Sequence, residues 1–386
     1  MKEKYEEIQG KFEHIVLDGS SYEIGQIQGN IFKKNSLDKM KKNRFPKFDF
    51  MTTANFNKEK SGFEDTEEIL KIEDRYCPGI IEEMQGFADS LDVEITNLAI
   101  HYFPVFPQDQ KKQNCTGLVF LPKITDNQHI LVGRTYDWFY KEEDNRLCST
   151  RVNRKYGHIG FSTLLFGRLE GINDKGLCII MTAGGAWDTP VKNKKAIPFW
   201  LPLRGFLENY KTTNEVIDRI TKIPIWTTTN FLITDPTGHV ALVEGNDSEY
   251  AVKEITLESE ENFLYSTNVY KLPKMIKHNQ YNNPWLLNIS KVRNEAIEQK
   301  IHEMRPKISN EFLRSFISTE IPEGLCAPWQ SGFFGALWGM IFDVTECSVE
   351  ICFGTPSYQS NQWQTFTPTG LHTTQDYEAI FLDKKG

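Results

Sequence analysis

The pattern of apolar and polar positions changes near residue 115 of this 386-residue chain. Before it, apolar residues recur at helical spacing, and Ser20 and Pro78 stand where helices begin. After it, short apolar runs alternate with turn signals, a pattern typical of strands. We therefore expect helices at 20–29, 67–76, 78–88 and 95–105, and strands at 116–121, 129–138, 158–166, 168–173, 177–183, 229–234 and 239–244.

A helical block of two segments over 198–222 interrupts these strands, and a further helix begins at 288. Two more strands are expected within 336–353. Antiparallel strands flanked by grouped helices favour a layered α+β fold with two sheets between helical layers. No Pro/Gly/Ser-rich linker divides the chain, so we expect one structural unit.

Composition narrows the class of protein. The net charge of -8 and the lack of basic blocks argue against a nucleic-acid-binding surface. The chain has no apolar run of 18 residues, so we expect no membrane-spanning helix. Its first residues are charged and do not form a secretory signal. The 7 scattered cysteines form no CxxC pair, which favours a reducing compartment and argues against zinc. We expect a cytoplasmic protein with no metal, cofactor, nucleic acid or membrane as a partner.

One cysteine is a candidate nucleophile. Cys115 opens a predicted strand, and Arg134 and Asp137 close the next one. The start of one antiparallel strand lies beside the end of its neighbour, so the three side chains converge at one edge of a sheet. A nearby cation favours the reactive thiolate form of a cysteine. Cysteines inside apolar runs, such as Cys178 and Cys352, are predicted to fill the core.

The residues around this hairpin carry a family resemblance. Asn114-Cys115-Thr116, followed by the run 133–138 (Gly-Arg-Thr-Tyr-Asp-Trp), resembles the nucleophile region of the N-terminal-nucleophile hydrolases. Within them it is similar to the branch of choloylglycine hydrolases, penicillin V acylases and acyl-CoA:6-aminopenicillanic acid acyltransferase (peptidase C45 type). Segments 22–29, 84–88, 170–177, 266–268 and 336–343 resemble further elements of that branch, in the same order.

The resemblance implies a fold and a maturation step. The fold is a four-layer αββα sandwich of antiparallel sheets with an N-terminal helical segment. Relatives with such a segment cut themselves before the cysteine, which makes Asn114-Cys115 the expected scissile bond. Residues 1–114 are then a helical pro-segment or α chain packed on the core, and residues 115–386 are the catalytic core. Many relatives carry Gly where this chain has Asn114.

The resemblance also implies roles for individual residues. The freed α-amine of Cys115 would act as the base for its own thiol. Asp137 would orient that amine, Arg134 would favour the thiolate, and Asn268 would donate to the oxyanion. Relatives place a second arginine in the site, but Arg293 and Arg314 fall on predicted helices and neither is assigned. The aromatic residues expected to line an acyl pocket are Trp138, Tyr140 and Trp187.

The predicted reaction cleaves or forms a non-peptide C–N amide through an acyl-enzyme on Cys115. Its partners would be a small acyl amide, or an acyl thioester plus an amine, and the resemblance also implies a homo-oligomer. Two alternatives stay open. One is an acyl-CoA-dependent N-acyltransferase with little hydrolysis, and the other is a non-catalytic scaffold with the same fold.

Overall fold

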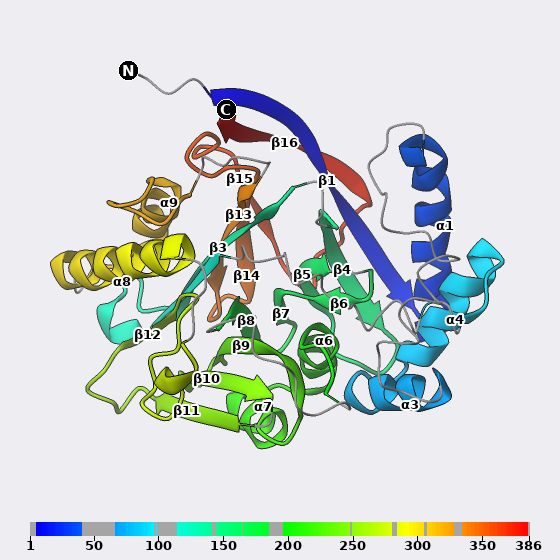
Figure 1. The fold of residues 1–386 in the computed structure, drawn as a ribbon, viewed down its shortest axis with the longest axis horizontal. Coiled ribbons are helices and arrows are strands. Elements are labelled where there is room, and N and C mark those ends of the chain that lie inside the picture. The colour runs from blue at the N-terminus through cyan, green and yellow to red at the C-terminus, as the bar shows by residue number, and fades with distance from the viewer. Residues whose placement is uncertain are drawn as a thin grey trace.

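The structure, a computed structural model, describes residues 5–40, 66–95, 98, 114–140, 144–163, 165–184, 196–247, 249–279, 284–304, 307–327 and 334–384. Within these residues, two mainly antiparallel sheets pack face to face between layers of helices (Figure 1). The predicted α+β fold with αββα layering is therefore confirmed. No described helix is long and apolar enough to span a membrane.

The larger sheet has the strand order β11-β10-β9-β8-β7-β5-β4-β1-β16, and the short β6 pairs with β5. Neighbouring strands are antiparallel except β1 and β4, which are parallel. Its strands are β1 (Tyr5–Gly19), β4 (Arg146–Val152), β5 (His158–Thr163), β6 (Gly167–Arg168), β7 (Glu170–Asn173), β8 (Cys178–Ala183), β9 (Ile225–Thr234), β10 (Val240–Asp247), β11 (Glu249–Ile255) and β16 (Gln375–Lys384).

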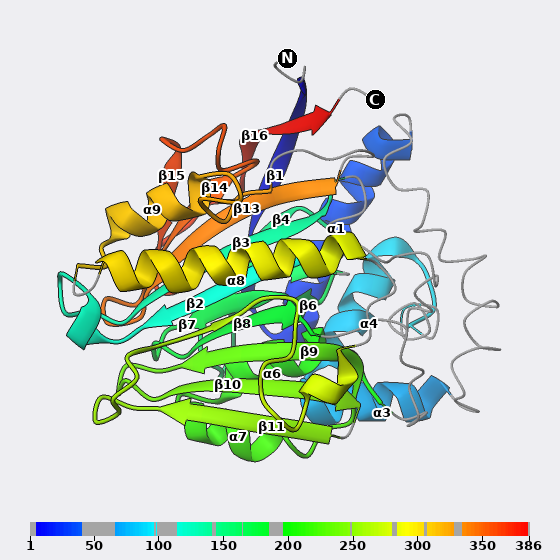
Figure 2. The same ribbon diagram turned by 60° about the vertical axis from the view of Figure 1, so that its left-hand side comes forward.

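The smaller sheet carries the candidate site and has the order β12-β2-β3-β13-β14-β15. Helices α8 (Pro284–Met304) and α9 (Asn310–Ser318) lie across it (Figure 2). They bury Ile297 and Ile317 against its outer face, where Leu118 projects. Its strands are β2 (Asn114–Phe120), β3 (Leu131–Phe139), β12 (Phe263–Ser266), β13 (Phe334–Asp343), β14 (Ser348–Phe353) and β15 (Trp363–Phe366).

The remaining helices lie on the side of the larger sheet (Figure 1). They are α1 (Ser21–Met40), α3 (Thr66–Tyr76), α4 (Ile80–Leu91), α6 (Trp200–Asn209) and α7 (Thr213–Ile220). Helix α7 begins with a capping box between Thr212 and Glu215, which satisfies its first N–H groups. These helices confirm the predictions at 20–29, 67–76, 78–88 and 198–222. Most of the helix predicted at 95–105 lies outside the described residues.

The sequence predicts a mainly helical N-terminal segment, but residues 5–19 form the long strand β1. Phe12 enters the core between the sheets, whereas Ile15 and Leu17 pack on the opposite face with α1. A strand buried on both faces lacks the simple apolar–polar alternation that identifies a strand locally. Its partners β4 and β16 are also distant in sequence, so the pairing is invisible in a local window.

Two motifs that precede Cys115 in the sequence serve helix packing. Helices α1 and α4 cross closely at glycines. A Cβ on Gly25 would lie 2.0 Å from the Glu83 carbonyl oxygen, and one on Gly86 would lie 2.1 Å from that of Tyr22. Only glycine permits such an approach of two helix backbones. Segments 22–29 and 84–88 therefore hold the N-terminal helices together.

A buried ion-pair network joins this N-terminal segment to the rest of the molecule. Arg204 on α6 bonds both carboxylate oxygens of Glu83 on α4, at 2.9 and 2.5 Å, and Glu208 at 2.8 Å. Lys155 donates to the other oxygen of Glu208 at 2.6 Å. We call Glu83, Lys155, Arg204 and Glu208 the docking cluster.

The segment 170–177 forms the tight turn between β7 and β8. The Asn173 carboxamide accepts from the N–H groups of Lys175 and Leu177, both at 3.0 Å. Gly176 has a φ of 82°, in the left-handed region that glycine occupies without strain. The asparagine and glycine of this motif therefore shape the turn, and Glu170 is its residue that reaches the candidate site.

Candidate active site

The β2–β3 hairpin brings the predicted residues together but divides them between two faces. Its register pairs Asn114 with Asp137, Cys115 with Tyr136 and Gly117 with Arg134. Directly paired residues share a face and successive residues alternate. The thiol and Arg134 therefore face the larger sheet, whereas Asp137 faces the helices α8 and α9. The three predicted residues thus lie at the same end of the hairpin, with Asp137 on the opposite face from Cys115 and Arg134.

Arg134 links the thiol to a carboxylate that the sequence did not single out. Its guanidinium lies within hydrogen-bonding reach of Cys115. Its Nε donates to Glu170 Oε2 at 3.0 Å, and both side chains are fully buried. A buried arginine needs such a counter-charge. A signal for Glu170 was its acidic side chain between the apolar residues Leu169 and Ile172 of a predicted strand.

Burial dominates the electrostatics at the thiol. It raises the pKa of Cys115 above its usual range, and the positive charge of Arg134 opposes that shift. The described chain is continuous through Asn114 and Cys115, which form the first two residues of β2. In this continuous chain the thiol is shielded from solvent.

Asp137 pairs with the arginine that sequence reasoning left unassigned. Arg293 on α8 donates from one Nη to Asp137 Oδ2 and to the Leu325 carbonyl, both at 2.6 Å. Burial raises the pKa of Asp137, and the positive charge of Arg293 opposes this. By contrast, Arg314 pairs with Glu350 at the protein surface and lies outside the site.

A sequence signal for Arg293 existed. It occupies one position of a series spaced four residues apart, whose other members are apolar and buried. A charged residue in an apolar helical stripe needs a buried partner. The series is Ile289, Arg293, Ile297 and Ile301.

Asn268 contacts the nitrogen of the expected scissile bond. It follows β12, and its Oδ1 accepts from the Cys115 backbone N–H at 2.7 Å. Its Nδ2 donates to the Ala183 carbonyl at 3.0 Å. The oxygen and N–H of a trans peptide point in opposite directions, so the Asn114 carbonyl points away from Asn268. Asn268 thus bonds the nitrogen of the Asn114-Cys115 peptide.

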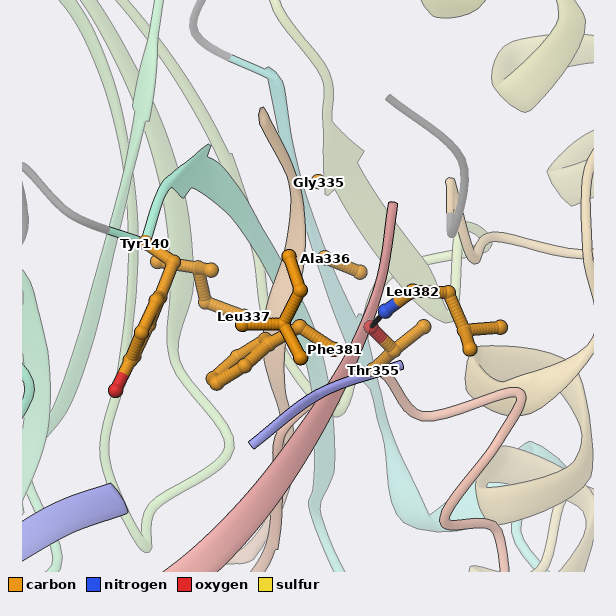
Figure 3. Close-up of a pocket in the computed structure, with 8 residues that line it drawn as sticks. Tyr140, Gly335, Ala336, Leu337, Thr355, Phe381 and Leu382 are labelled. Atoms are coloured by element: carbon orange, nitrogen blue, oxygen red, sulfur yellow. Dashed lines mark hydrogen bonds between the residues drawn. The ribbon is translucent and has the colours of Figure 1, made fainter. Parts of the chain in front are cut away.

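The predicted pocket aromatics occupy different settings. Trp138 is buried on β3, and Trp187 lies outside the described residues. A small hollow is lined by Tyr140, Leu337 and Phe381, and Leu382 lines its opposite side from Tyr140 (Figure 3). This hollow has room for about one water molecule. Contact between these aromatics and an acyl chain stays a prediction.

Solved structures with resemblance to this chain share low sequence identity with it. A Caenorhabditis elegans N-acylethanolamine-hydrolyzing acid amidase ortholog is 16% identical, with a TM-score of 0.43 over 66% of this chain and 99% of its own. A mutant conjugated bile acid hydrolase from Clostridium perfringens is 16% identical, with a TM-score of 0.43 over 68% and 96%. Penicillin V acylase from Agrobacterium tumefaciens is 16% identical, with a TM-score of 0.36 over 62% and 83%.

Comparison with curated protein sequences gives no match. A family model does match, over residues 124–358, which is more than half of the chain. This region begins shortly after Cys115 and contains Arg134, Asp137, Asn268 and Arg293. The chain belongs to the acyl-coenzyme A:6-aminopenicillanic acid acyltransferase family.

Proposed function

We propose that this chain is a self-processing cysteine enzyme that cleaves or forms a C–N amide through an acyl-enzyme on Cys115. The observation that carries the proposal is the set of contacts around one peptide bond. Arg134 lies at the thiol, Asn268 bonds the Cys115 N–H, and Asp137 is paired across the hairpin with Asn114.

Maturation begins when the Cys115 sulfur attacks the Asn114 carbonyl carbon. The C–N bond breaks, the nitrogen gains a proton, and a thioester joins Asn114 to the sulfur. Water then cleaves the thioester, leaving a carboxylate on Asn114 and a free thiol and α-amine on Cys115. A free α-amine has a pKa of about 7.7–8.0, suited to accept the proton of the thiol at neutral pH.

In turnover, the same thiol attacks the acyl carbon of a substrate. Asp137 orients the α-amine, and Arg134 stabilises the thiolate. After the cut, Asn268 Oδ1 accepts from the amine of Cys115, and Asn268 Nδ2, which bonds the Ala183 carbonyl in the continuous chain, is the donor to the developing oxyanion. One such donor contributes roughly 3–4 kcal/mol to lowering a barrier. The acyl group then passes to water or to an amine.

Residues 1–114 stay bound as a subunit after the cut. Strand β1 pairs with both β4 and β16, and the docking cluster ties α4 to α6. These contacts are extensive and buried, so cleavage of one peptide bond does not release the segment. Homo-oligomerisation and a cytoplasmic location stay predictions from the sequence.

Intact-mass spectrometry of freshly made protein beside Cys115→Ala tests the proposal. We expect fragments ending at Asn114 and starting at Cys115 from the native chain, and one uncut chain from the variant. Synthesis in H₂¹⁸O should place one heavy oxygen on the Asn114 carboxylate, because water cleaves the thioester. Cleavage of the Cys115→Ala chain at the same bond would overturn the proposed maturation.

Acyl transfer is the second candidate for turnover, and the family match favours it. Hydrolysis and transfer share the acyl-enzyme and differ only in the acceptor. Incubation of the mature enzyme with an acyl thioester and a series of amines measures the ratio of amide to free acid. Amide formation above the uncatalysed rate identifies an acyltransferase, and acid alone identifies a hydrolase.

A further inference from the structure

The helix-facing side of the β2–β3 hairpin is unusually polar for a buried surface. Two cross-strand residue pairs lie next to each other on this face: Asn114 is paired with Asp137, and Thr116 with Thr135. A Cβ on Gly133, two residues from Thr135 and on the same face, would contact Ile317 of α9. The face therefore lies under the helical layer, where α8 also contributes polar side chains. We call this set the polar face; its members are Asn114, Thr116, Thr135, Asp137, Ser290 and Arg293.

Most polar atoms of this face have no hydrogen-bond partner within the described residues. They include both carboxamide atoms of Asn114, the Thr116, Thr135 and Ser290 hydroxyls, Asp137 Oδ1, and the Nε and one Nη of Arg293. All six residues are at least 99% buried. Buried polar groups are costly without partners, and ordered water commonly supplies them. A buried space lined by this many unpartnered donors and acceptors favours the binding of ordered water.

The thiol side of the same hairpin carries the buried Arg134–Glu170 pair, and the rest of it is packed with aromatic rings. Tyr136, paired with Cys115, stacks on Trp338 at a centroid distance of 4.3 Å. Trp338 stacks in turn on Phe161 at 3.9 Å. Such packing leaves little room for water next to the sulfur in the uncut chain. The Asn114 carbonyl thus has a thiol on one side and a polar compartment on the other.

We propose that the polar face holds the water that hydrolyses the maturation thioester, with Thr116 and Thr135 as positioning residues. This deepens the proposed self-processing and rests on it. The water oxygen attacks the Asn114 carbonyl carbon and passes a proton to Asp137. The C–S bond breaks, the departing sulfur takes a proton from the adjacent α-amine of Cys115, and that amine recovers a proton from Asp137. Thioester and water thereby become a carboxylic acid and a thiol, with no other reactant.

The double variant Thr116→Val/Thr135→Val tests this assignment, because valine keeps the shape of threonine and removes its hydroxyl. The full-length chain is made by cell-free synthesis, and cleavage is followed by gel and mass spectrometry. We expect cleavage at Asn114-Cys115 to slow about tenfold or more, because water loses hydrogen bonds that position it. Thr116→Ser/Thr135→Ser, which keeps both hydroxyls, should restore most of the rate.

Hydroxylamine separates loss of water positioning from loss of thioester formation. It cleaves a thioester directly and leaves a hydroxamate on Asn114. We expect it to restore cleavage of the Val/Val variant. If hydroxylamine has no effect, the thioester does not form in the variant, and the assignment of a water-positioning role is overturned.

The control is Thr234→Val on β9, which removes another buried hydroxyl that is unpartnered within the described residues and lies on the larger sheet. It should cleave at the native rate. A Val/Val variant that also cleaves at the native rate would refute the polar-face assignment alone. Cleavage that persists in Cys115→Ala would instead refute the proposed self-processing, so the two failures are distinguishable.

Discussion

Two buried charged regions of this molecule differ in how completely their polar atoms are paired. In the docking cluster, all three guanidinium nitrogens of Arg204 and all four carboxylate oxygens of Glu83 and Glu208 have partners. Around the candidate site, both Nη atoms of Arg134 lack a nitrogen or oxygen partner among the described residues. Asp137 has one partnered and one unpartnered oxygen there.

This difference separates a structural role from a chemical one. A fully paired buried network fixes the relative position of the elements that contribute to it. Unpaired buried groups are instead available to a substrate, a water molecule or a developing charge. The pKa values of one carboxylate from each region differ in the same sense. That of Glu208 is lowered to about 2 by Arg204 and Lys155 despite burial, whereas that of Asp137 is raised by burial.

The largest expected effect comes from breaking the docking cluster. Arg204→Met leaves Glu83 and Glu208 buried without their main counter-charge. We expect the free energy of unfolding to fall by about 3–5 kcal/mol. Urea denaturation followed by circular dichroism measures the change, and the specific activity of the fraction that stays folded should be close to native.

The matched control is Arg314→Met, which removes a single arginine–carboxylate pair at the surface. The Arg314 side chain is 43% exposed, so its pair with Glu350 should contribute less than about 1 kcal/mol. Equal losses of stability in the two arginine variants would contradict a special role for the docking cluster.

The second-largest expected effect is a loss of enzyme activity. Glu170→Gln keeps the shape of the side chain but removes the charge that holds Arg134. We expect turnover by the mature enzyme to fall roughly 100-fold, the effect of a displacement of about 1 Å near reacting atoms. A steady-state assay with any acyl amide that the enzyme accepts measures this loss.

The same variant should shift a pH profile in a direction that misfolding would not. Removing a negative charge near Arg134 leaves more positive potential at the thiol, which lowers the pKa of Cys115. The pH of half-maximal alkylation by iodoacetamide should therefore decrease relative to the native enzyme. An unchanged or higher midpoint would show that Glu170 does not act on the thiol through Arg134.

The sequence predicted the part of the site that is local. The β2–β3 hairpin follows from two apolar runs and a turn, and it alone places Cys115, Arg134 and Asp137 near one another. Arg293 meets Asp137 across 156 residues, and Glu170 meets Arg134 from the opposite sheet. Such contacts depend on how layers pack, which no local pattern specifies.

The same reason explains which parts of the fold were missed. Helices α6 and α7 were predicted from helical spacing of apolar residues, and strands β8 to β10 from short apolar runs bounded by turn signals. Strand β1 was not, because charged residues interrupt its first half and both of its partners come from distant segments. The motifs around Gly25 and Gly86 were seen, but their role in helix packing became clear only from the close backbone approach.

The smallest expected effect tests that packing role within the N-terminal region. Gly86→Ala would place a methyl group 2.1 Å from the Tyr22 carbonyl oxygen, so α1 and α4 must move apart. We expect a loss of about 1–3 kcal/mol in the free energy of unfolding, typical of overpacking. In Gly133→Ala the new Cβ meets nothing closer than 3.4 Å, so its stability should change far less. If the two alanine variants unfold at the same urea concentration, the glycine crossing does not hold the N-terminal helices together. If Gly86→Ala also cleaves itself at the native rate, the contact between α1 and α4 has a structural role, like that of the docking cluster, and no role in the chemistry.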